Sequence, residues 1–426
     1  MEKDTIFALA TAKGRAGVAI VRVSGPNAVT ATQNLCGRVP ESRGVRTLTS
    51  DDDILDQALV LRFPEGQSFT GEEVIELHLH GSHAVVAAVL RVLGDQVGLR
   101  HAEAGEFTRR ALENGCLDLA QVEGLADLID AETEAQRRQA FRVFQGSLGD
   151  LANSWRKDLL RAAALVEATI DFVDEDVPVN VFPEVAELLA GVRTGLVAQT
   201  DGVGAAEIIR DGFEVAIIGA PNVGKSTLLN ALAGRDAAIT SEIAGTTRDI
   251  IEVRMDIDGY AVTVLDTAGL RVTDDRVEKL GIDLARRRAD SADLRIHLLD
   301  PETGHTDLDV RPEDIVVYGK ADLFKSVGNS ISGVTGDGIN ELIQLVSGRL
   351  QKMLNSAGVA TRDRHRVAML QAITFLDAAT QMIENEIHDI VAEEIRSGIR
   401  AIDLIVGRID VEDLLGEIFS SFCIGK

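Results

Sequence analysis

The chain has 426 residues, of which 45% are apolar, and a formal net charge of −25 at pH 7. This length suffices for two or three domains with buried cores. Apolar stretches stay shorter than the roughly 18 residues that span a bilayer, and the first residues lack the basic and apolar regions of a signal peptide. The acidic balance repels nucleic acid unless a basic partner helps to hold it. The composition therefore predicts a cytoplasmic protein without membrane contact.

The cysteine and arginine residues give little indication of a disulfide framework, a metal site or a nucleic-acid site. Cys36, Cys116 and Cys423 are few and far apart, which argues against a disulfide framework or a zinc site and fits a reducing compartment. Two short basic clusters lie at residues 286–288 and 362–366. Each is typical of a solvated helix face with ion pairs, and a nucleic-acid contact is the alternative interpretation.

Residues 1–117 form a predicted α+β module. Strands are expected at 18–23 and 74–80, and a helix at 84–93. From 118 to 209 the pattern becomes helical, with apolar residues at the spacing of one buried helix face. These residues are Trp155, Leu159, Ala163, Val166 and Ile170.

Residues 219–226, Gly-Ala-Pro-Asn-Val-Gly-Lys-Ser, match the phosphate-binding loop G-x-x-x-x-G-K-[ST]. An apolar strand at 214–218 precedes the loop and a helical pattern follows, so backbone N–H groups and a helix dipole would face phosphate oxygens. Lys225 is expected at the β and γ phosphates, and Ser226 at magnesium. The predicted nucleotide contacts are Asn222, Val223, Gly224, Lys225, Ser226 and Thr227.

Two further loops follow in the order found in GTPases. The sequence Gly-Thr-Thr-Arg-Asp at 245–249 would offer a hydroxyl to magnesium. Asp266 ends an apolar strand and can hold magnesium through water, while the N–H of Gly269 can sense the γ-phosphate. Hydrolysis would release both loops, as in a molecular switch. The predicted contacts are Ser241, Glu242, Ile243, Ala244, Gly245, Thr246, Thr247, Asp266, Thr267, Ala268 and Gly269.

The base-reading loop departs from the usual Asn-Lys-x-Asp, because it contains Gly319, Lys320, Ala321 and Asp322. Asp322 can still accept two hydrogen bonds from guanine, which adenine cannot supply. The missing amide removes a hydrogen bond of about 0.5–1.5 kcal/mol, so we predict weak nucleotide binding and fast exchange. A last guanine loop, with glycine in place of the usual alanine, is expected at Ser332, Gly333 and Val334.

The residues that drive hydrolysis are less evident. Leu270 stands where many switch GTPases have a water-orienting glutamine, and leucine cannot orient water. Residues 273–279 supply several polar candidates, although a solvated helix start is the other interpretation. The sequence identifies no arginine finger, so another group, such as a second cation, must neutralise the charge that develops on the phosphate.

The end of the chain is helical again, with apolar residues at Val367, Leu370, Met382, Ile387 and Ile390. If the helices before and after the nucleotide loops did not pack on each other, each set would expose its apolar stripe to water. We therefore predict a multidomain chain in three parts. These are an α+β N-terminal module (1–117), an all-α helical domain in two pieces (118–209 and 356–426), and an inserted α/β P-loop GTPase domain (210–355).

Several stretches outside the nucleotide loops resemble one family over essentially the whole chain. They lie at residues 14–22, 69–73, 105–108 and 117–121, and Phe-Cys-Ile-Gly-Lys occupies 422–426. Together with the Gly-Thr-Thr-Arg-Asp switch and the inserted domain, they resemble the MnmE, or TrmE, family of tRNA modification GTPases.

The resemblance implies a catalytic core. Glu278 would orient the attacking water, and a potassium ion would replace the arginine finger. Pairing of two G domains in a homodimer would activate hydrolysis. The implied potassium contacts are Asn222, Ser241, Ile243 and Thr246, where the family usually has threonine in place of Ser241. The implied magnesium contacts are Ser226 and Thr247.

The resemblance also implies a reaction on tRNA. With the flavin- and NADH-dependent partner MnmG, in an expected heterotetramer, the family adds an aminomethyl or carboxymethylaminomethyl group to C5 of the wobble uridine. A reduced folate would supply the one-carbon unit from a pocket of the N-terminal module, which is also the dimerisation module. The implied folate contacts are Arg22, Glu76, Cys116 and Lys426, and many relatives have lysine in place of Cys116. Taken alone, Arg22 would be a strand-edge arginine with a solvated head.

Two alternatives stay open. Cys423 would lie near the folate and the target base, where a thiolate could assist the chemistry, or it is a buried and inert cysteine. The chain could also be a ribosome-assembly GTPase that acts as a binding switch, although a compact basic domain for RNA is missing from the sequence.

Overall fold

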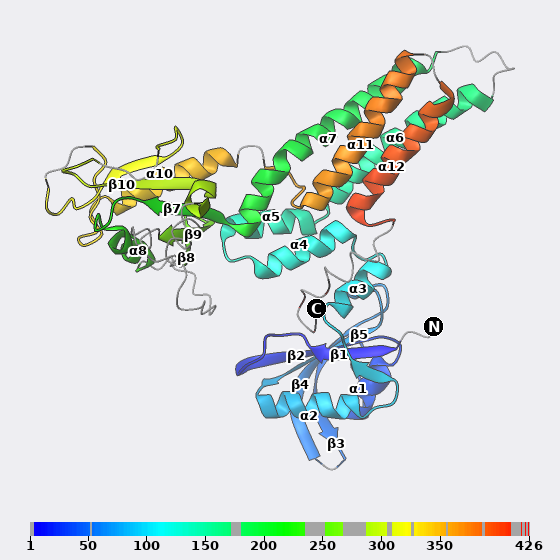
Figure 1. The fold of residues 1–426 in the computed structure, drawn as a ribbon. Coiled ribbons are helices and arrows are strands. Elements are labelled where there is room, and N and C mark those ends of the chain that lie inside the picture. The colour runs from blue at the N-terminus through cyan, green and yellow to red at the C-terminus, as the bar shows by residue number, and fades with distance from the viewer. Residues whose placement is uncertain are drawn as a thin grey trace, which may run out of the picture. The chain divides into compact units, whose positions relative to one another are not determined.

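The structure is a computed structural model that describes residues 4–51, 53–171, 180–234, 252–266, 287–304, 309–324, 328–354, 357–385 and 388–409, with Phe419, Phe422 and Gly425. The chain forms two compact units, one of Met1–Ala126 with Asp403–Lys426 and the other of Asp127–Ile402. The predicted fold class is confirmed, since an α+β module, a helical domain and an inserted α/β domain are all present (Figure 1). The exact domain boundaries stay predictions. Among the described residues, helices long and apolar enough to cross a membrane are absent.

The first unit contains a six-stranded sheet in the order β3-β4-β5-β2-β1-β6. Neighbouring strands are antiparallel except for the parallel pair β1 and β6. The predicted strands at 18–23 and 74–80 are confirmed within β2 and β5. The strands are β1 (Thr5–Leu9), β2 (Ala16–Ser24), β3 (Arg43–Ser50), β4 (Asp53–Phe63), β5 (Val74–Gly81) and β6 (Leu99–His101).

Helices cover the two faces of this sheet unequally. α1 (Ala28–Cys36) and α2 (His83–Gly94) pack on one face, where Val21, Val23 and Leu77 are fully buried. α3 (Glu106–Glu113) packs on the other face, where Phe107 meets Ile6. Side chains alternate between the two faces along a strand, so the residues next to Val21, Val23 and Leu77 in the chain point away from α1 and α2.

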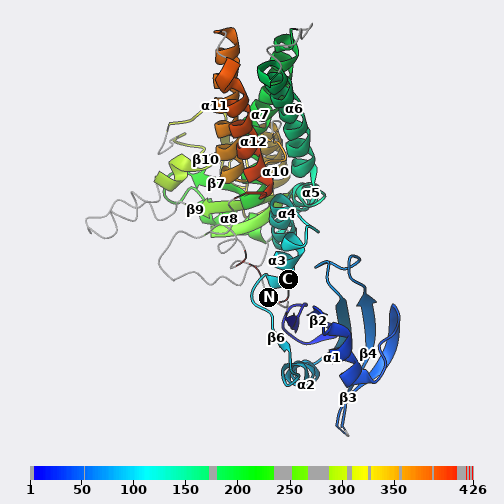
Figure 2. The same cartoon turned by 90° about the vertical axis from the view of Figure 1, so that its right-hand side faces the viewer.

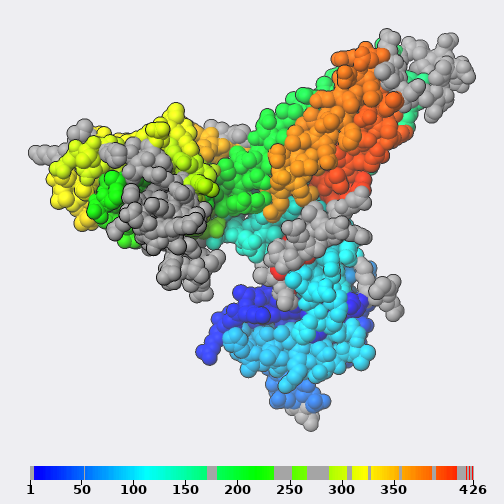
Figure 3. Space-filling model, in the orientation of Figure 1, coloured from blue at the N-terminus to red at the C-terminus, as the bar shows by residue number. Residues whose placement is uncertain are grey.

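The helical part of the second unit is built on four long helices that run side by side in both ribbon views (Figures 1 and 2). Figure 3 shows α11 and α12 next to each other on the surface of this bundle. The predicted buried face of α6 is confirmed at Trp155, Leu159, Ala163 and Val166, while the side chain of Ile170 lies outside the described residues. The helices of the helical domain are α4 (Leu119–Asp130), α5 (Glu134–Phe144), α6 (Ser147–Asp171), α7 (Phe182–Asp211), α11 (Asp363–Glu384) and α12 (His388–Val406). The start of α4 and the end of α12 belong to the first unit.

The helical pattern predicted near the end of the chain is confirmed by α11 and α12, but the large apolar residues of that pattern are not the buried ones. Val367 and Leu370 are 43% and 42% exposed, and Ile390 on α12 is 47% exposed. Small residues are buried instead because the helices approach closely, and a Cβ at Gly398 of α12 would lie 3.3 Å from Leu376 of α11. The buried positions of α11 include Ala368, Met369, Ala372, Leu376 and Ala379. Met382 is half-buried, and Ile387 lies outside the described residues.

The inserted domain has a five-stranded sheet in the order β11-β10-β7-β9-β8, parallel except for the antiparallel hairpin of β8 and β9. β7 is central, so the loops at the carboxyl ends of the parallel strands gather at one edge, where α/β sheets bind ligands. Its elements are β7 (Phe213–Ile218), α8 (Lys225–Ala233), β8 (Glu252–Ile257), β9 (Tyr260–Asp266), β10 (Leu294–Leu299), β11 (Ile315–Tyr318) and α10 (Ile339–Met353).

A buried charge cluster braces the opposite edge of this sheet. Asp314 accepts a 2.6 Å hydrogen bond from Arg295 Nη2 and a 2.7 Å hydrogen bond from the Arg311 backbone N–H, and the His297 ring nitrogen lies 2.9 Å from the same carboxylate. Burial opposes ionisation of Asp314, but the hydrogen bonds from Arg295, the Arg311 backbone and His297 together lower the pKa of the carboxyl. The cluster fixes β11 beside β10.

Candidate functional site

The phosphate-binding loop lies between β7 and α8, as the sequence predicts. The loop turns through left-handed backbone at Asn222, with φ 63°, and at Gly224, with φ 108°. Gly224 is the residue before α8, so the first N–H groups of that helix open onto the loop. Val223 is buried in the domain core and anchors the loop, whereas Asn222, Ser226 and Thr227 are exposed.

Lys225 is buried at the start of α8, with 6% of its surface exposed. Its Nζ donates to the carbonyl oxygens of Gly219, at 2.5 Å, and Ala220, at 3.1 Å. A buried ammonium needs such partners. The loop therefore already surrounds the positive charge that phosphate oxygens would meet.

The base-reading loop follows β11, and a side-chain contact of Lys320 helps to hold it. Lys320, with left-handed backbone at φ 59°, places Nζ 2.8 Å from Asp300 Oδ2 at the end of β10. The hydrogen bond from Lys320 lowers the pKa of Asp300. Sequence reasoning missed Asp300, since the only signal was an acidic residue directly after a buried strand.

The two predicted guanine loops lie together. Ser332 Oγ donates to Asp322 Oδ1 at 2.6 Å, and the backbone N–H of Ala321 donates to Ile331 O at 3.1 Å. The same Ser332 oxygen accepts from the N–H of Val334 at 3.2 Å. A serine from the second loop thereby orients Asp322, the residue predicted to read the guanine edge.

The switch residues are described only in part. Asp266 ends β9, with its backbone beside Ile217 of β7, at the same sheet edge as the phosphate-binding loop. Its side chain lies outside the described residues. So do Ser241, Glu242, Ile243, Ala244, Gly245, Thr246, Thr247, Thr267, Ala268, Gly269 and Glu278.

The N-terminal module brings two predicted residues together. Arg22 on β2 and Glu76 on β5 are cross-strand partners, with Arg22 Nε 3.0 Å from Glu76 Oε1 and Nη2 2.9 Å from the same oxygen. The guanidinium also lies 5.5 Å from the ring centroid of Phe69 and 5.6 Å from that of Phe107. Two aromatic rings and a carboxylate therefore fix this arginine. Both phenylalanines lie in the stretches at 69–73 and 105–108, which could have pointed to them.

Cys116 lies beside the segment that carries Phe69. Gly71 has left-handed backbone, and a Cβ there would lie 2.9 Å from Cys116 Sγ. Asn114 Nδ2 donates to Thr70 O at 2.6 Å, which holds this segment in place. Lys426 and Cys423 lie outside the described residues.

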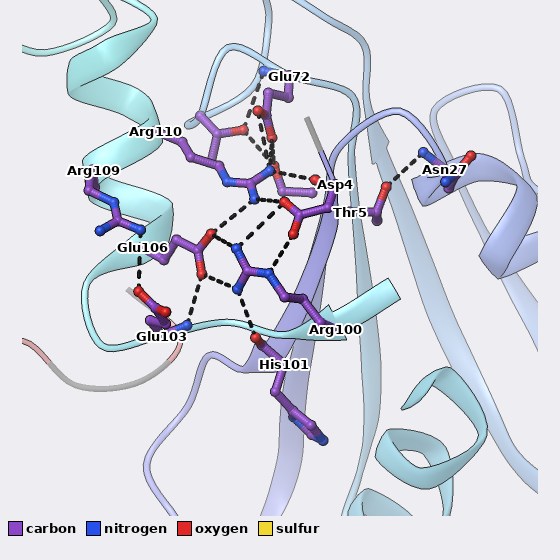
Figure 4. A network of polar contacts seen from close by, with 12 residues as sticks. Asp4, Thr5, Asn27, Glu72, Arg100, His101, Glu103, Glu106, Arg109 and Arg110 are labelled. Atoms are coloured by element: carbon purple, nitrogen blue, oxygen red, sulfur yellow. Dashed lines mark hydrogen bonds and ion pairs between the residues drawn. The ribbon is translucent and has the colours of Figure 1, made fainter. Parts of the chain in front are cut away.

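A charge network supports α3, which carries Phe107 (Figure 4). Glu106 accepts from Arg100 Nη2 at 2.6 Å and from Arg110 Nη2 at 2.9 Å. Asp4 and Glu72 both bind Arg110, with Nη2 2.8 Å from Asp4 Oδ1 and Nη1 3.1 Å from Glu72 Oε2. Burial of Glu106 opposes ionisation, but the hydrogen bond from Arg100 and further N–H donors lower the pKa of the carboxyl to about 2. The network joins α3 to β6 and to the start of β1.

Comparison with known proteins matches nearly the whole chain. A family model described as GTP-binding protein TrmE N-terminus matches residues 5–116, and one described as MnmE helical domain matches residues 119–423. Proteins named tRNA modification GTPase MnmE are similar over 99% of this chain and 100% of their own length. Identity is 59% for Cereibacter sphaeroides, 58% for Ruegeria pomeroyi and 48% for Paracoccus denitrificans. The chain therefore belongs to the MnmE, or TrmE, family of tRNA modification GTPases.

Proposed function

We propose that this chain, a GTP hydrolase of tRNA modification, cleaves GTP with the help of potassium in place of an arginine finger. The observation that carries the proposal is the loop before α8, where Lys225 is buried at the helix start and Asn222 is exposed on left-handed backbone. Glu278 would orient the attacking water, because Leu270 cannot. Two G domains of a homodimer would enclose the nucleotides.

The residues of the loop fit the two cations. Magnesium prefers hard oxygen ligands, and the exposed Ser226 hydroxyl on α8 is such a group, with Thr247 as its proposed partner. Asn222 is exposed on left-handed backbone in the loop, and its neutral amide oxygen suits a monovalent cation. Ser241, Ile243 and Thr246 would complete the potassium site. These cations would neutralise charge on the transferring phosphate.

The test is GTP turnover in potassium and in sodium at equal ionic strength. Asn222→Ala should remove most of the potassium stimulation, and Glu278→Ala should remove turnover in both salts while GDP binding is kept. A matched control is Asn230→Ala on the exposed face of α8, which should change neither. Equal rates in both salts for the unaltered protein would refute the potassium site but leave GTP hydrolysis intact.

We propose that Arg22 and Glu76 belong to a pocket for a reduced folate, together with Cys116 and Lys426. The support is chemical. A guanidinium fixed between two rings can bind a carboxylate of the glutamate tail, and a carboxylate can accept from the pterin N–H groups. The Cys116 thiol offers a weaker contact than the lysine usual in relatives, so affinity should be reduced.

Calorimetric titration with 5-formyltetrahydrofolate tests this pocket. Arg22→Ala and Glu76→Gln should each weaken binding about tenfold or more, since each removes a charge-assisted hydrogen bond. Cys116→Lys should strengthen it. Arg43→Ala is the control, because Arg43 is an exposed arginine on β3 of the same sheet. Equal loss in the Arg43 variant would point to general electrostatics instead of a pocket.

The modification itself would be shared with MnmG. We propose that the folate supplies the one-carbon unit for an aminomethyl or carboxymethylaminomethyl group at C5 of the wobble uridine, in a cytoplasmic heterotetramer of the two proteins. Residues 1–117 would hold the homodimer together. Nucleoside analysis of tRNA incubated with both proteins, GTP and a reduced folate tests the reaction, and light scattering tests the assembly. Loss of product in Cys423→Ser with unchanged GTP turnover would assign Cys423 to this step.

A further inference from the structure

The two base-reading loops approach the phosphate-binding loop without any intervening side chain. A Cβ at Gly319 would lie 2.9 Å from the carbonyl oxygen of Val223. A Cβ at Gly333 would lie 2.8 Å from the carbonyl carbon of Thr227 and 3.0 Å from the N of Leu228. All of these neighbours are backbone atoms, which cannot move aside as a flexible side chain can.

Backbone conformation does not explain the two glycines. Neither Gly319 nor Gly333 is among the residues with positive φ, so a side chain would be tolerated by the local backbone alone. The close approach of the two loops to the backbone of the phosphate-binding loop and α8 therefore explains why glycine occupies both positions. The usual residues at these positions, asparagine and alanine, each carry a Cβ. The two departures from the usual motif face the same short segment, from the phosphate-binding loop into the first turn of α8.

Contacts around Gly319 would transmit any shift to the residue that reads guanine. Gly319 N donates to Leu299 O at 2.9 Å, and Lys320 is tied to Asp300 at 2.8 Å. Asp322 is bound to Ser332 of the second loop at 2.6 Å. Because these bonds leave little room for local relaxation, a side chain at Gly319 would displace the loop and Asp322 together.

We infer that Gly319 and Gly333 are positioning residues that let the guanine-reading loops pack directly on the phosphate-binding loop, so asparagine at 319 weakens guanine nucleotide binding in this chain. The added amide hydrogen bond expected from the usual motif would be outweighed by the displaced loop. This reverses the simple sequence-based view that the missing asparagine is a defect. The inference rests on the proposed assignment of 319–322 and 332–334 to the guanine loops.

The experiment measures affinities for GDP and IDP, which lacks the 2-amino group that Asp322 would bind. Gly319→Asn, Gly319→Ala and Gly333→Ala should each weaken GDP binding about tenfold or more, the range of an overpacked contact. Their preference for GDP over IDP should also fall, because Asp322 is displaced. Gly348→Ala is the control, since a Cβ at that half-buried position of α10 meets nothing within 4 Å.

Each outcome decides a different point. Tighter GDP binding by Gly319→Asn would overturn the inference, as would weaker binding with an unchanged preference for GDP over IDP, which signals a general loss of stability. If Gly319→Asn fails to fold, Gly319→Ala decides in the same way. Asp322→Ala distinguishes a failure of the guanine-loop assignment from a failure of the glycine inference alone. If it leaves GDP binding unchanged, the guanine-loop assignment fails and the inference with it; if it weakens binding, only the glycine inference is at stake.

Discussion

Lys225 Nζ lies 2.5 Å from the carbonyl oxygen of Gly219, the first residue of the loop that Lys225 itself closes. The ammonium is thus shared between loop carbonyls and any phosphate that enters. Nucleotide binding must reorganise or share these hydrogen bonds, so part of the gross phosphate interaction is offset.

Lys225→Met tests this relationship, because methionine keeps the length of the side chain and removes its charge. We expect GDP affinity to fall by about 100-fold, equivalent to one or two charge-assisted hydrogen bonds. Stability without nucleotide should fall little, because the carbonyl oxygens can turn to water while the buried charge disappears. Fluorescence titration and urea unfolding measure the two quantities. A large loss of stability would mean that the loop needs the ammonium to fold.

Asp322→Asn should change the base that is read. A carboxylate accepts from the two N–H donors of the guanine edge, whereas an amide presents a donor that suits the carbonyl of xanthine. GDP affinity should fall about tenfold or more, and affinity for xanthosine diphosphate should rise. Competition titrations with both nucleotides check this. Ser332→Ala, which removes the 2.6 Å contact to Asp322, should weaken GDP binding by a smaller factor.

Glu106 should make the first unit sensitive to acid. Its folded pKa of about 2 lies below the usual 4.5, so the ionised carboxylate stabilises the fold above pH 4.5. This contribution, on the order of 3 kcal/mol, is lost as pH falls from 4.5 toward 2. Glu106→Gln should lose a comparable amount at pH 7 and show a flatter acid profile. Hydrogen exchange over residues 99–113 measures it.

Glu134 supplies the matched control for that experiment. It binds Arg137 and Arg138 on the surface of α5, and the hydrogen bond from Arg137 is the main reason that the pKa of its carboxyl is also lowered to about 2. Water and salt screen such exposed pairs. Glu134→Gln should therefore change stability little. A loss as large as that of Glu106→Gln would contradict the role given to burial.

Asp314→Asn should destabilise the inserted domain strongly. The substitution leaves Arg295, which is 2% exposed, without its main charged partner, and breaking a buried pair costs about 3–5 kcal/mol. Hydrogen exchange in β10 and β11 should show the loss. Asp290 binds the same arginine at 3.2 Å but is half exposed. Asp290→Asn should cost about 1 kcal/mol or less.

The sequence predicts local features of the nucleotide site well and long-range ones poorly. The loop around Lys225 was predictable because a strand, a glycine turn and a helix are adjacent in the chain. The Lys320–Asp300 and Ser332–Asp322 contacts join loops that only the folded sheet brings together. Spacing alone gives no signal for them.

Packing of the helices shows the same limit. Val367 and Leu370 are large apolar residues of α11, yet they are exposed and the bundle buries Ala372 and Ala379 on another face. Alanine carries little apolar surface, so a pattern of large residues overlooks it. Close helix approach, visible only between distant segments, decides which face is inside.

The aromatic residues near the end of the chain have a consequence for synthesis. Phe419 and Phe422 pack with Val122, and a Cβ at Gly425 would lie 2.1 Å from the carbonyl oxygen of Leu9. All of these residues belong to the first compact unit, which is interrupted by the 127–402 unit. On the ribosome, the α+β module therefore emerges first with its own core residues, whereas the cluster around Val122 closes last. A nascent chain that stalls in the inserted domain would leave Val122 without these aromatic partners.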